Sequence, residues 1–192
     1  MRMTMRWALA PLCLMALAAC GEGGAGKADG TGAAAPSNRT LTATLKDDRA
    51  FGTLERVLDN AALGEVLAGT GPYTVFAPSD AAFAASAGDL GDEAMRAQGA
   101  AVLRAHIVPG ALTRADILAA IAREGSGKVE MRTMANSLLT FSTEGETLIV
   151  AGDDGARARV TGPEAVASNG VVQPVDGLLV RTAVPAAAAA AN

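Results

Sequence analysis

The spacing of hydrophobic residues along the chain changes near Lys128. Before this residue, apolar positions recur three or four apart, as in the pairs Leu41 and Leu45 or Leu54 and Leu58, and this period is typical of amphipathic helices. After it, apolar and polar residues alternate, which is typical of half-buried strands. Helices followed by strands predict an α+β domain with an antiparallel sheet.

One strand is predicted within the helical part of the chain, over residues 73–77. This stretch is short, apolar and rich in strand-forming residues, so it suits a strand that is covered on both faces. Pro78 is expected to end the strand because proline has no N–H group to donate to a sheet. Ser79 or Asp80 is then expected to cap a helix whose first turn carries Phe83.

Short helices are predicted on both sides of this strand. Before it, the pattern favours two or three helices between residues 41 and 67, broken near Asp47-Asp48 and Asp59-Asn60. After it, helices are predicted over residues 80–87, 93–104 and 114–124. Asp92 is expected to cap the second of these, and Thr113 with Asp116 forms a capping-box pattern before the third.

The alternating part of the chain predicts a series of strands joined by tight turns. The predicted strands cover residues 129–133, 138–143, 147–151, 157–161, 171–172 and 178–180. Turn signals separate them at Asn136-Ser137, Glu144-Gly145, Asp154-Gly155 and Asn169-Gly170. This spacing favours hairpins between consecutive strands.

Three segments of the chain resemble the signature segments of the fasciclin (FAS1) family. Residues 74–83 (TVFAPSDAAF) are similar to the family's T-V-F-A-P-[ST]-[DN]-x-A-F. Residues 103–110 (LRAHIVPG) are similar to L-x-Y-H-[VI]-[VI]-P-G, and residues 168–179 (SNGVVQPVDGLL) to S-N-G-V-[IV]-H-x-[IV]-D-x-[VL]-L. The resemblance implies the FAS1 fold, a wedge-like antiparallel β-sandwich with a helical layer, over residues 39–184.

The beginning of the chain resembles a bacterial lipoprotein leader. Arg2 and Arg6 precede thirteen apolar residues at 7–19, which are too few to span a bilayer as a helix. Residues 17–20 (LAAC) match the lipobox, so we predict a signal peptide over 1–19 and a lipidated Cys20. An ordinary signal peptide is the alternative. Residues 20–38 are predicted to form a flexible Gly/Ala-rich tether and residues 185–192 a disordered tail.

These segments predict an exported, membrane-anchored lipoprotein. Two or more acyl chains hold a protein stably at a bilayer, and Cys20 is their predicted attachment point. Gly21 stands where an Asp would favour the inner membrane, so the resemblance implies the outer membrane, on its periplasmic or surface face. Cys13 leaves with the leader, so no disulfide is expected in the mature protein.

Charge and motifs argue against nucleic-acid binding and catalysis. The net charge of −4 becomes −6 when Arg2 and Arg6 are removed, whereas nucleic acid favours a basic face. No catalytic motif is present and His106 is the single histidine, so we expect no enzyme, metal site or cofactor. Three carboxylate pairs lie at predicted caps or turns, where acids serve backbone donors or solvent, at Asp47-Asp48, Asp92-Glu93 and Asp153-Asp154.

His106, Ile107 and Val108 form the candidate interaction segment. A histidine among apolar residues usually bonds a backbone group and joins two elements, and we favour this role for His106. In animal fasciclin proteins the Tyr-His pair of this segment is implicated in integrin-mediated adhesion. Ala105 replaces the Tyr here, and Gln173 stands where the family often has a second His, so a two-histidine switch is excluded.

The resemblance predicts a lipid-anchored, non-catalytic interaction module of the cell envelope. Its expected partner is an envelope or extracellular-matrix protein or polysaccharide, with the membrane reached through Cys20. The alternative is an envelope lipoprotein that binds a small apolar ligand between the helical layer and the sheet. An enzyme of unrecognised type is a third, weaker hypothesis.

Overall fold

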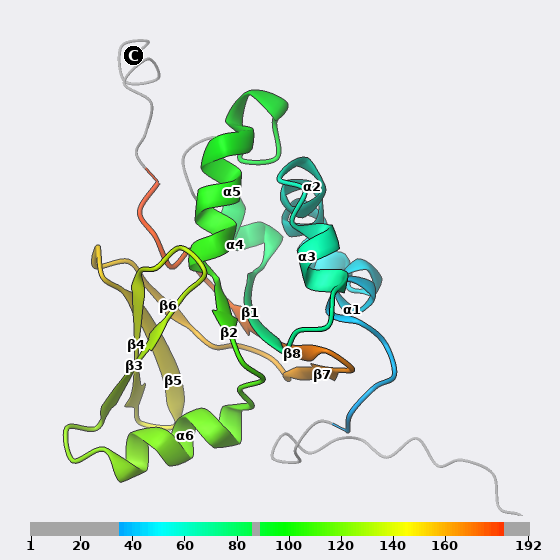
Figure 1. Ribbon diagram of the computed structural model, residues 1–192. Helices are drawn as coiled ribbons and strands as arrows, with labels where there is room; N and C mark the ends of the chain where they lie inside the picture. Colours follow the sequence, from blue (N-terminus) through cyan, green and yellow to red (C-terminus); the bar gives the residue numbers. More distant parts are fainter. Residues whose placement is uncertain (1–34, 86–88, 183–192) are drawn as a thin grey trace, which may run out of the picture. The chain divides into compact units, whose positions relative to one another are not determined.

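The computed structural model describes residues 35–85 and 89–182 (Figure 1). All of them belong to one compact unit, which spans Gly32–Asn192. The predicted leader, Cys20, most of the predicted tether and the predicted tail lie outside the described residues.

Short helices dominate the first part of the described chain and strands the second. The helices are α1 (Leu41–Asp47), the 3-10 helix η1 (Arg49–Phe51), α2 (Gly52–Asn60), α3 (Gly64–Ala68), α4 (Asp80–Ala84), the 3-10 helix η2 (Glu93–Met95), α5 (Arg96–Ala105) and α6 (Arg114–Arg123). The strands are β1 (Tyr73–Pro78), β2 (Ile107–Pro109), β3 (Lys128–Arg132), β4 (Leu138–Glu144), β5 (Thr147–Gly152), β6 (Arg157–Arg159), β7 (Ala165–Ala167) and β8 (Gly170–Val175).

The strands form two four-stranded sheets, in the orders β2-β1-β8-β7 and β3-β4-β5-β6. All described strand pairs are antiparallel except β1 with β8, which are parallel. The sheets meet at a bridge between Val160 and Val175. The predicted α+β fold with an antiparallel β-sandwich is therefore confirmed. The parallel β1–β8 pair was not predicted, because hairpin signals report only the pairing of neighbouring strands, and β1 and β8 are far apart in sequence.

Strand β1 lies at the centre of the molecule and contributes to two hydrophobic cores. Val75 and Ala77 pack into the core beneath the helices, whereas Phe76 packs into the core between the two sheets. There its ring lies 5.2 Å from the ring of Phe141. Successive side chains of a strand point to opposite faces, so burial on both faces explains the continuous apolar run that predicted β1.

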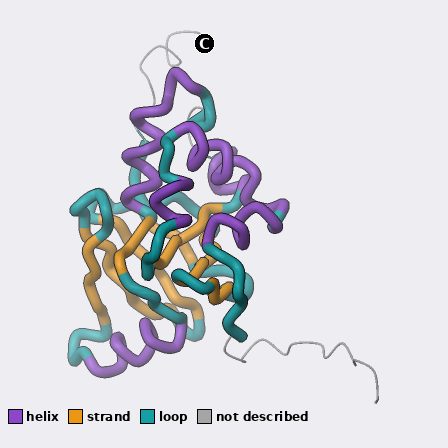
Figure 2. Tube along the Cα trace, turned by 45° about the vertical axis from the view of Figure 1, so that its right-hand side comes forward, coloured by secondary structure: helices purple, strands orange, loops and turns teal. Residues whose placement is uncertain are grey.

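Helices α1 to α5 cover one face of the sheet that contains β1, and the second sheet lies on the other side (Figure 1). Figure 2 shows these helices gathered together, with α6 apart from them beside the strands. Ile117 and Ile121 of α6 belong to the core between the sheets, so this helix closes one end of the sandwich.

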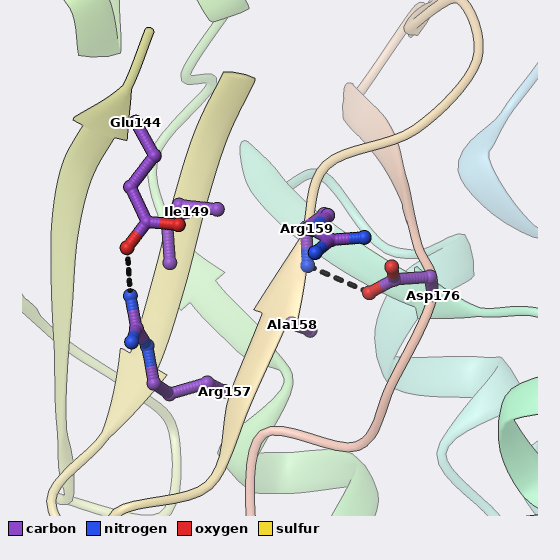
Figure 3. A pocket seen from close by; sticks show the side chains of 6 residues that line it. All are labelled: Glu144, Ile149, Arg157, Ala158, Arg159 and Asp176. Atoms are coloured by element: carbon purple, nitrogen blue, oxygen red, sulfur yellow. Dashed lines mark hydrogen bonds and ion pairs between the residues drawn. The ribbon is translucent and has the colours of Figure 1, made fainter.

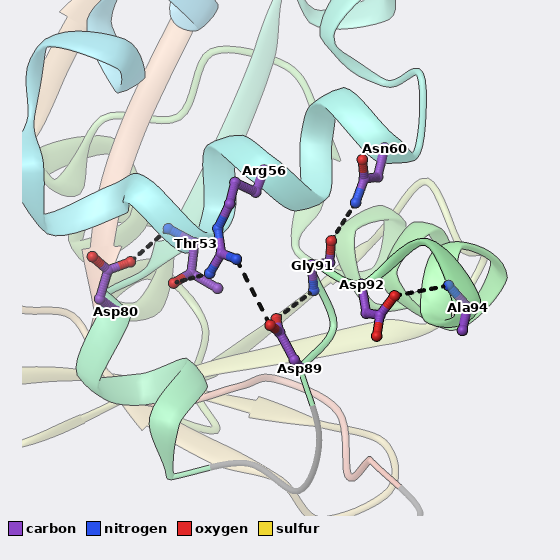
Figure 4. Close-up of polar contacts among 8 residues, drawn as sticks. All are labelled: Thr53, Arg56, Asn60, Asp80, Asp89, Gly91, Asp92 and Ala94. Atoms are coloured by element: carbon purple, nitrogen blue, oxygen red, sulfur yellow. Dashed lines mark hydrogen bonds and ion pairs between the residues drawn. The ribbon is translucent and has the colours of Figure 1, made fainter.

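Capping residues begin several helices, as predicted. Ser79 Oγ accepts from the Ala82 N–H (3.3 Å) and caps α4, while Asp80 accepts from the Thr53 N–H of α2 (2.7 Å) instead. Figure 4 shows this second bond among the polar contacts that join α2 to the segments around it. Thr113 and Asp116 form a complete capping box at α6.

The structure corrects several predicted boundaries. The helix predicted over 93–104 is divided into η2 and α5. Pro78 is the last residue of β1, and the strand predicted over 157–161 ends at Arg159. Residues 178–180 form no strand, because the Leu179 N–H bonds the His106 ring, and β7 was not predicted since its three residues carry no alternating pattern.

Candidate functional site

His106 follows α5 and is completely buried. Its Nε2 accepts a hydrogen bond from the Leu179 N–H (2.9 Å), and its Nδ1 lies 2.8 Å from the Val102 carbonyl oxygen. Because a backbone N–H can only donate, Nε2 must be the unprotonated nitrogen and Nδ1–H must donate to Val102. The ring thus joins α5 to the segment that follows β8, which confirms the predicted structural role.

Burial keeps the His106 ring neutral. Removal from water lowers the pKa of His106 from 6.5 to about 4, although the bond to the Val102 carbonyl partly opposes this change. A charged imidazole would carry a proton on Nε2, directly facing the Leu179 N–H. Both effects favour the neutral ring at physiological pH.

The neighbouring residues of the candidate segment are buried as well. Ile107 is 1% exposed and faces the helical core, while Val108 is 3% exposed and faces the core between the sheets. In the folded domain, a partner that approaches this segment therefore reaches Pro109 and the turn at Gly110 rather than these side chains. Pro109 is exposed, and a methyl group added at Gly110 would contact nothing within 4 Å.

Buried Thr74 of β1 holds this turn in place. Its hydroxyl donates to the Gly110 carbonyl (2.7 Å) and accepts from the Leu112 N–H (2.8 Å). The Gly110 N–H also donates to the Pro72 carbonyl (2.9 Å). The turn at the end of β2, which we define as residues 109–112 and which includes the last residue of the strand, is thus a fixed surface feature at one edge of the sheet.

Buried Gln173 belongs to a polar cluster with half-buried Arg114 and Glu164 that sequence reasoning missed. Its Nε2 donates to Glu164 Oε2 (2.6 Å), and its Oε1 accepts from the Arg114 guanidinium (3.3 Å). Glu164 Oε2 also accepts from the Arg114 N–H (2.6 Å) at the start of α6. The amide therefore joins β8 to α6, and no sequence signal links three residues so far apart in the chain.

Asn169 makes more contacts than the predicted turn requires. Its Oδ1 accepts from the Leu41 N–H (2.9 Å), and its Nδ2 donates to the carbonyls of Leu67 (2.7 Å) and Gly69 (2.8 Å). The next residue must be glycine, because a methyl group at Gly170 would lie 1.9 Å from a backbone oxygen of β1. The pair joins the β7–β8 turn to α1 and α3.

The predicted carboxylate pairs have structural roles. Asp48 accepts from the Ala50 N–H (3.0 Å) and Asp92 from the Ala94 N–H (3.2 Å). Asp154 Oδ2 accepts from the Arg181 N–H (2.5 Å). Within 35–85 and 89–182, no group of three or more His, Cys, Asp or Glu side chains is placed to hold a metal ion.

A polar cleft of about 240 Å³ lies beside β5 and β6 (Figure 3). At one side, the Arg157 guanidinium bonds the Glu144 carboxylate (2.6 Å). At the other, the Arg159 N–H donates to Asp176 Oδ1 (2.7 Å). The carboxylates of Glu144 and Asp176 are matched in number by the guanidinium groups of Arg157 and Arg159, so the lining of the cleft carries no net charge. None of the helices in the described part has the length and hydrophobicity to cross a membrane.

Comparison with known proteins identifies the family. The family model described as Fasciclin domain matches residues 49–181. Protein sll1483 of Synechocystis is 30% identical over 151 residues, which cover 77% of this chain and 76% of that protein. Human Stabilin-1 is 30% identical over 154 residues, which cover 73% of this chain but only 5% of Stabilin-1.

A solved structure shows the same fold. The FAS1 domain pair of the insect cell adhesion molecule Fasciclin I superposes with a TM-score of 0.64 at 18% identity, over 74% of this chain and 51% of that chain. The chain thus spans about half of that solved chain, and the low identity supports the shared fold alone. Because the family model and the Synechocystis relative agree, the chain belongs to the Fasciclin domain family.

Proposed function

We propose that this protein is a non-catalytic interaction module of the cell envelope, which contacts an envelope or extracellular-matrix protein or polysaccharide. Membership of the Fasciclin domain family carries this proposal. The related fold of an insect cell adhesion molecule is consistent with it, although a fold alone does not fix a function.

The roles of the polar residues support a non-catalytic function. His106, Gln173 and Asn169 bond backbone groups or buried side chains and so stabilise contacts between elements. A general base needs access to a substrate proton, whereas the His106 ring is fully buried and both of its nitrogens are occupied.

The proposal includes an anchor at Cys20, reached through the tether. The described end of the tether lies along the edge strand β7, since the Ser37 N–H donates to the Val166 carbonyl (2.9 Å) and the Ser168 N–H to the Arg39 carbonyl (2.8 Å). Strand β2 is the other edge of this sheet. The tether end lies one further spacing outside β7, so the turn at 109–112 is four strand spacings from it, about 19 Å. We place the interaction surface at this turn.

Cross-linking in intact cells tests the proposal. The full chain and a Cys20→Ala variant are expressed in the source organism, cross-linked and captured, and the bound protein and polysaccharide are identified by mass spectrometry and sugar analysis. The anchored chain is expected to recover a defined envelope component that the variant recovers weakly. Recovery of only lipid and the export machinery by both chains would contradict the proposal.

The N-terminal peptide of the captured protein tests the anchor separately. Lipidation predicts a peptide that begins at Cys20 and carries the mass of a diacylglyceryl group and an acyl chain. A peptide that begins elsewhere and carries no lipid would contradict the anchor. The interaction module would then be tested by the cross-linking experiment alone.

A further inference from the structure

A cleft of about 400 Å³ opens among helices α1, α2 and α3, away from the turn at 109–112. We propose that it binds a small organic cation, an ammonium group carried on an apolar chain. This activity goes beyond the proposed interaction module, which uses the edge of the sheet. The ligand site predicted from the sequence lay between the helical layer and the sheet, where buried side chains now fill the space. The present cleft lies elsewhere, among the helices.

The inner wall of the cleft is apolar. Its lining includes the buried side chains of Leu45 of α1 and Leu58 of α2, which are only 2% and 4% exposed, together with half-buried Ala43 and exposed Ala68. Its volume lies within the range of small-molecule sites, about 300–1,000 Å³. An alkyl chain placed against these side chains would be removed from water, which favours binding in proportion to the apolar area buried.

Glycine keeps the cleft open at the start of α3. A methyl group added at Gly64 would meet only Asp59 Oδ1, at 3.6 Å, which is an ordinary contact. The backbone at Gly64 is helical, so its conformation does not require glycine. A larger side chain at this position would therefore enter the cleft without a clash with the backbone.

The rim of the cleft is acidic and selects the charge of the ligand. The lining residues carry three carboxylates, those of Glu55, Asp59 and Glu65, and one ammonium group, that of Lys46. Lys46 Nζ lies 3.5 Å from Glu55 Oε1 and offsets that charge. Among the described residues, no hydrogen bond or ion pair joins the side chains of Asp59 and Glu65 to a partner, so two negative charges face the opening and favour a cation.

The probe is octylammonium, with octan-1-ol and octanoate as controls of equal chain length. Each is titrated below its micelle concentration into the full chain carrying Cys20→Ala, and methyl NMR signals of Leu45 and Leu58 are followed. Octylammonium is expected to shift these signals saturably, with affinity about tenfold higher than that of octanoate and a marked loss at high salt. Equal affinity for octanoate, or no saturation at these signals, would overturn the proposal.

Variants separate the apolar wall from the charged rim. Gly64→Leu is expected to fill the cleft and abolish the saturable shifts. The pair Asp59→Asn with Glu65→Gln is expected to weaken octylammonium about 3- to 10-fold and leave octan-1-ol unchanged, while Glu146→Gln in the exposed β4–β5 turn has no effect. If Gly64→Leu fails to fold, the double variant Asp59→Asn with Glu65→Gln still tests the proposal. An unchanged affinity of this double variant for octylammonium would contradict a cation site in the cleft.

Discussion

The single histidine shows how one buried residue joins distant parts of this domain. His106 was assigned a structural role from its apolar neighbours, and the structure confirms it with bonds to Val102 and Leu179. The bond to Leu179 was not predictable, because residues 178–180 resemble a strand in sequence and nothing in the pattern pairs them with the end of α5.

The free energy of unfolding is expected to decrease as the pH is lowered, because His106 takes up a proton when the chain unfolds. Its pKa is about 4 in the folded chain and 6.5 for the ordinary group, so between these values the unfolded chain binds a proton that the folded chain does not. This contribution is complete above pH 6.5 and is lost progressively as pH falls to about 4, on the order of 3 kcal/mol in total. Urea unfolding of the wild type at pH 7.5 and pH 5 measures the loss.

His106→Gln is the control for this loss. The variant keeps every other ionisable group and lacks only the imidazole, so the difference between wild type and variant isolates the histidine. We expect the variant to be less stable at pH 7.5 and to have a smaller pH dependence. An unchanged pH dependence in the variant would assign the acid sensitivity to other groups.

Asn169→Ala is expected to lower the free energy of unfolding by about 3 kcal/mol, because one buried N–H and two carbonyls lose their partner. The affected groups belong to Leu41, Leu67 and Gly69. Thermal and urea unfolding measure the change. Exposed Asn38→Ala serves as the control and is expected to stay within about 0.5 kcal/mol of the wild type; similar values for both variants would contradict the role of Asn169.

At the level of elements, signals that lie close together in sequence predicted the structure best. The capping box at Thr113, the buried strand β1 and the hairpin β4–β5 all follow from short patterns, and each is confirmed. The parallel β1–β8 pair and the Arg114–Glu164–Gln173 cluster depend on contacts between distant residues. A single sequence carries no signal for these, so they required the structure.

The capping box at α6 provides a test at this scale. Hydrogen bonds from Thr113 to Asp116 lower the pKa of the Asp116 carboxyl. Thr113→Ala is therefore expected to raise the pKa of Asp116 toward its ordinary value and to cost about 1 kcal/mol of stability. Carboxyl NMR titration and urea unfolding measure the two effects, with exposed Thr70→Ala as the control. A pKa of Asp116 that does not move would show that the box is absent in solution.

The whole molecule is organised around one sheet with two different edges. Residues 37–39, at the end of the predicted tether, lie along β7, and the turn at 109–112 lies at the end of β2, at the opposite edge. The family resemblance predicted the sandwich and its helical layer, and the fold of the insect FAS1 domain pair confirms them. The position of residues 35–39 could not be predicted, because they carry no strand pattern.

The most direct test of the account is cellular capture with Ala111→Arg, compared with Ala50→Arg. Both alanines are exposed, but Ala111 lies in the proposed interaction turn and Ala50 in η1. Quantitative mass spectrometry of the cross-linked partner is expected to show a large loss for Ala111→Arg and wild-type recovery for Ala50→Arg, when both chains are present in the cells at equal levels. Equal recovery by the two variants would contradict an interaction surface at the turn at the end of β2.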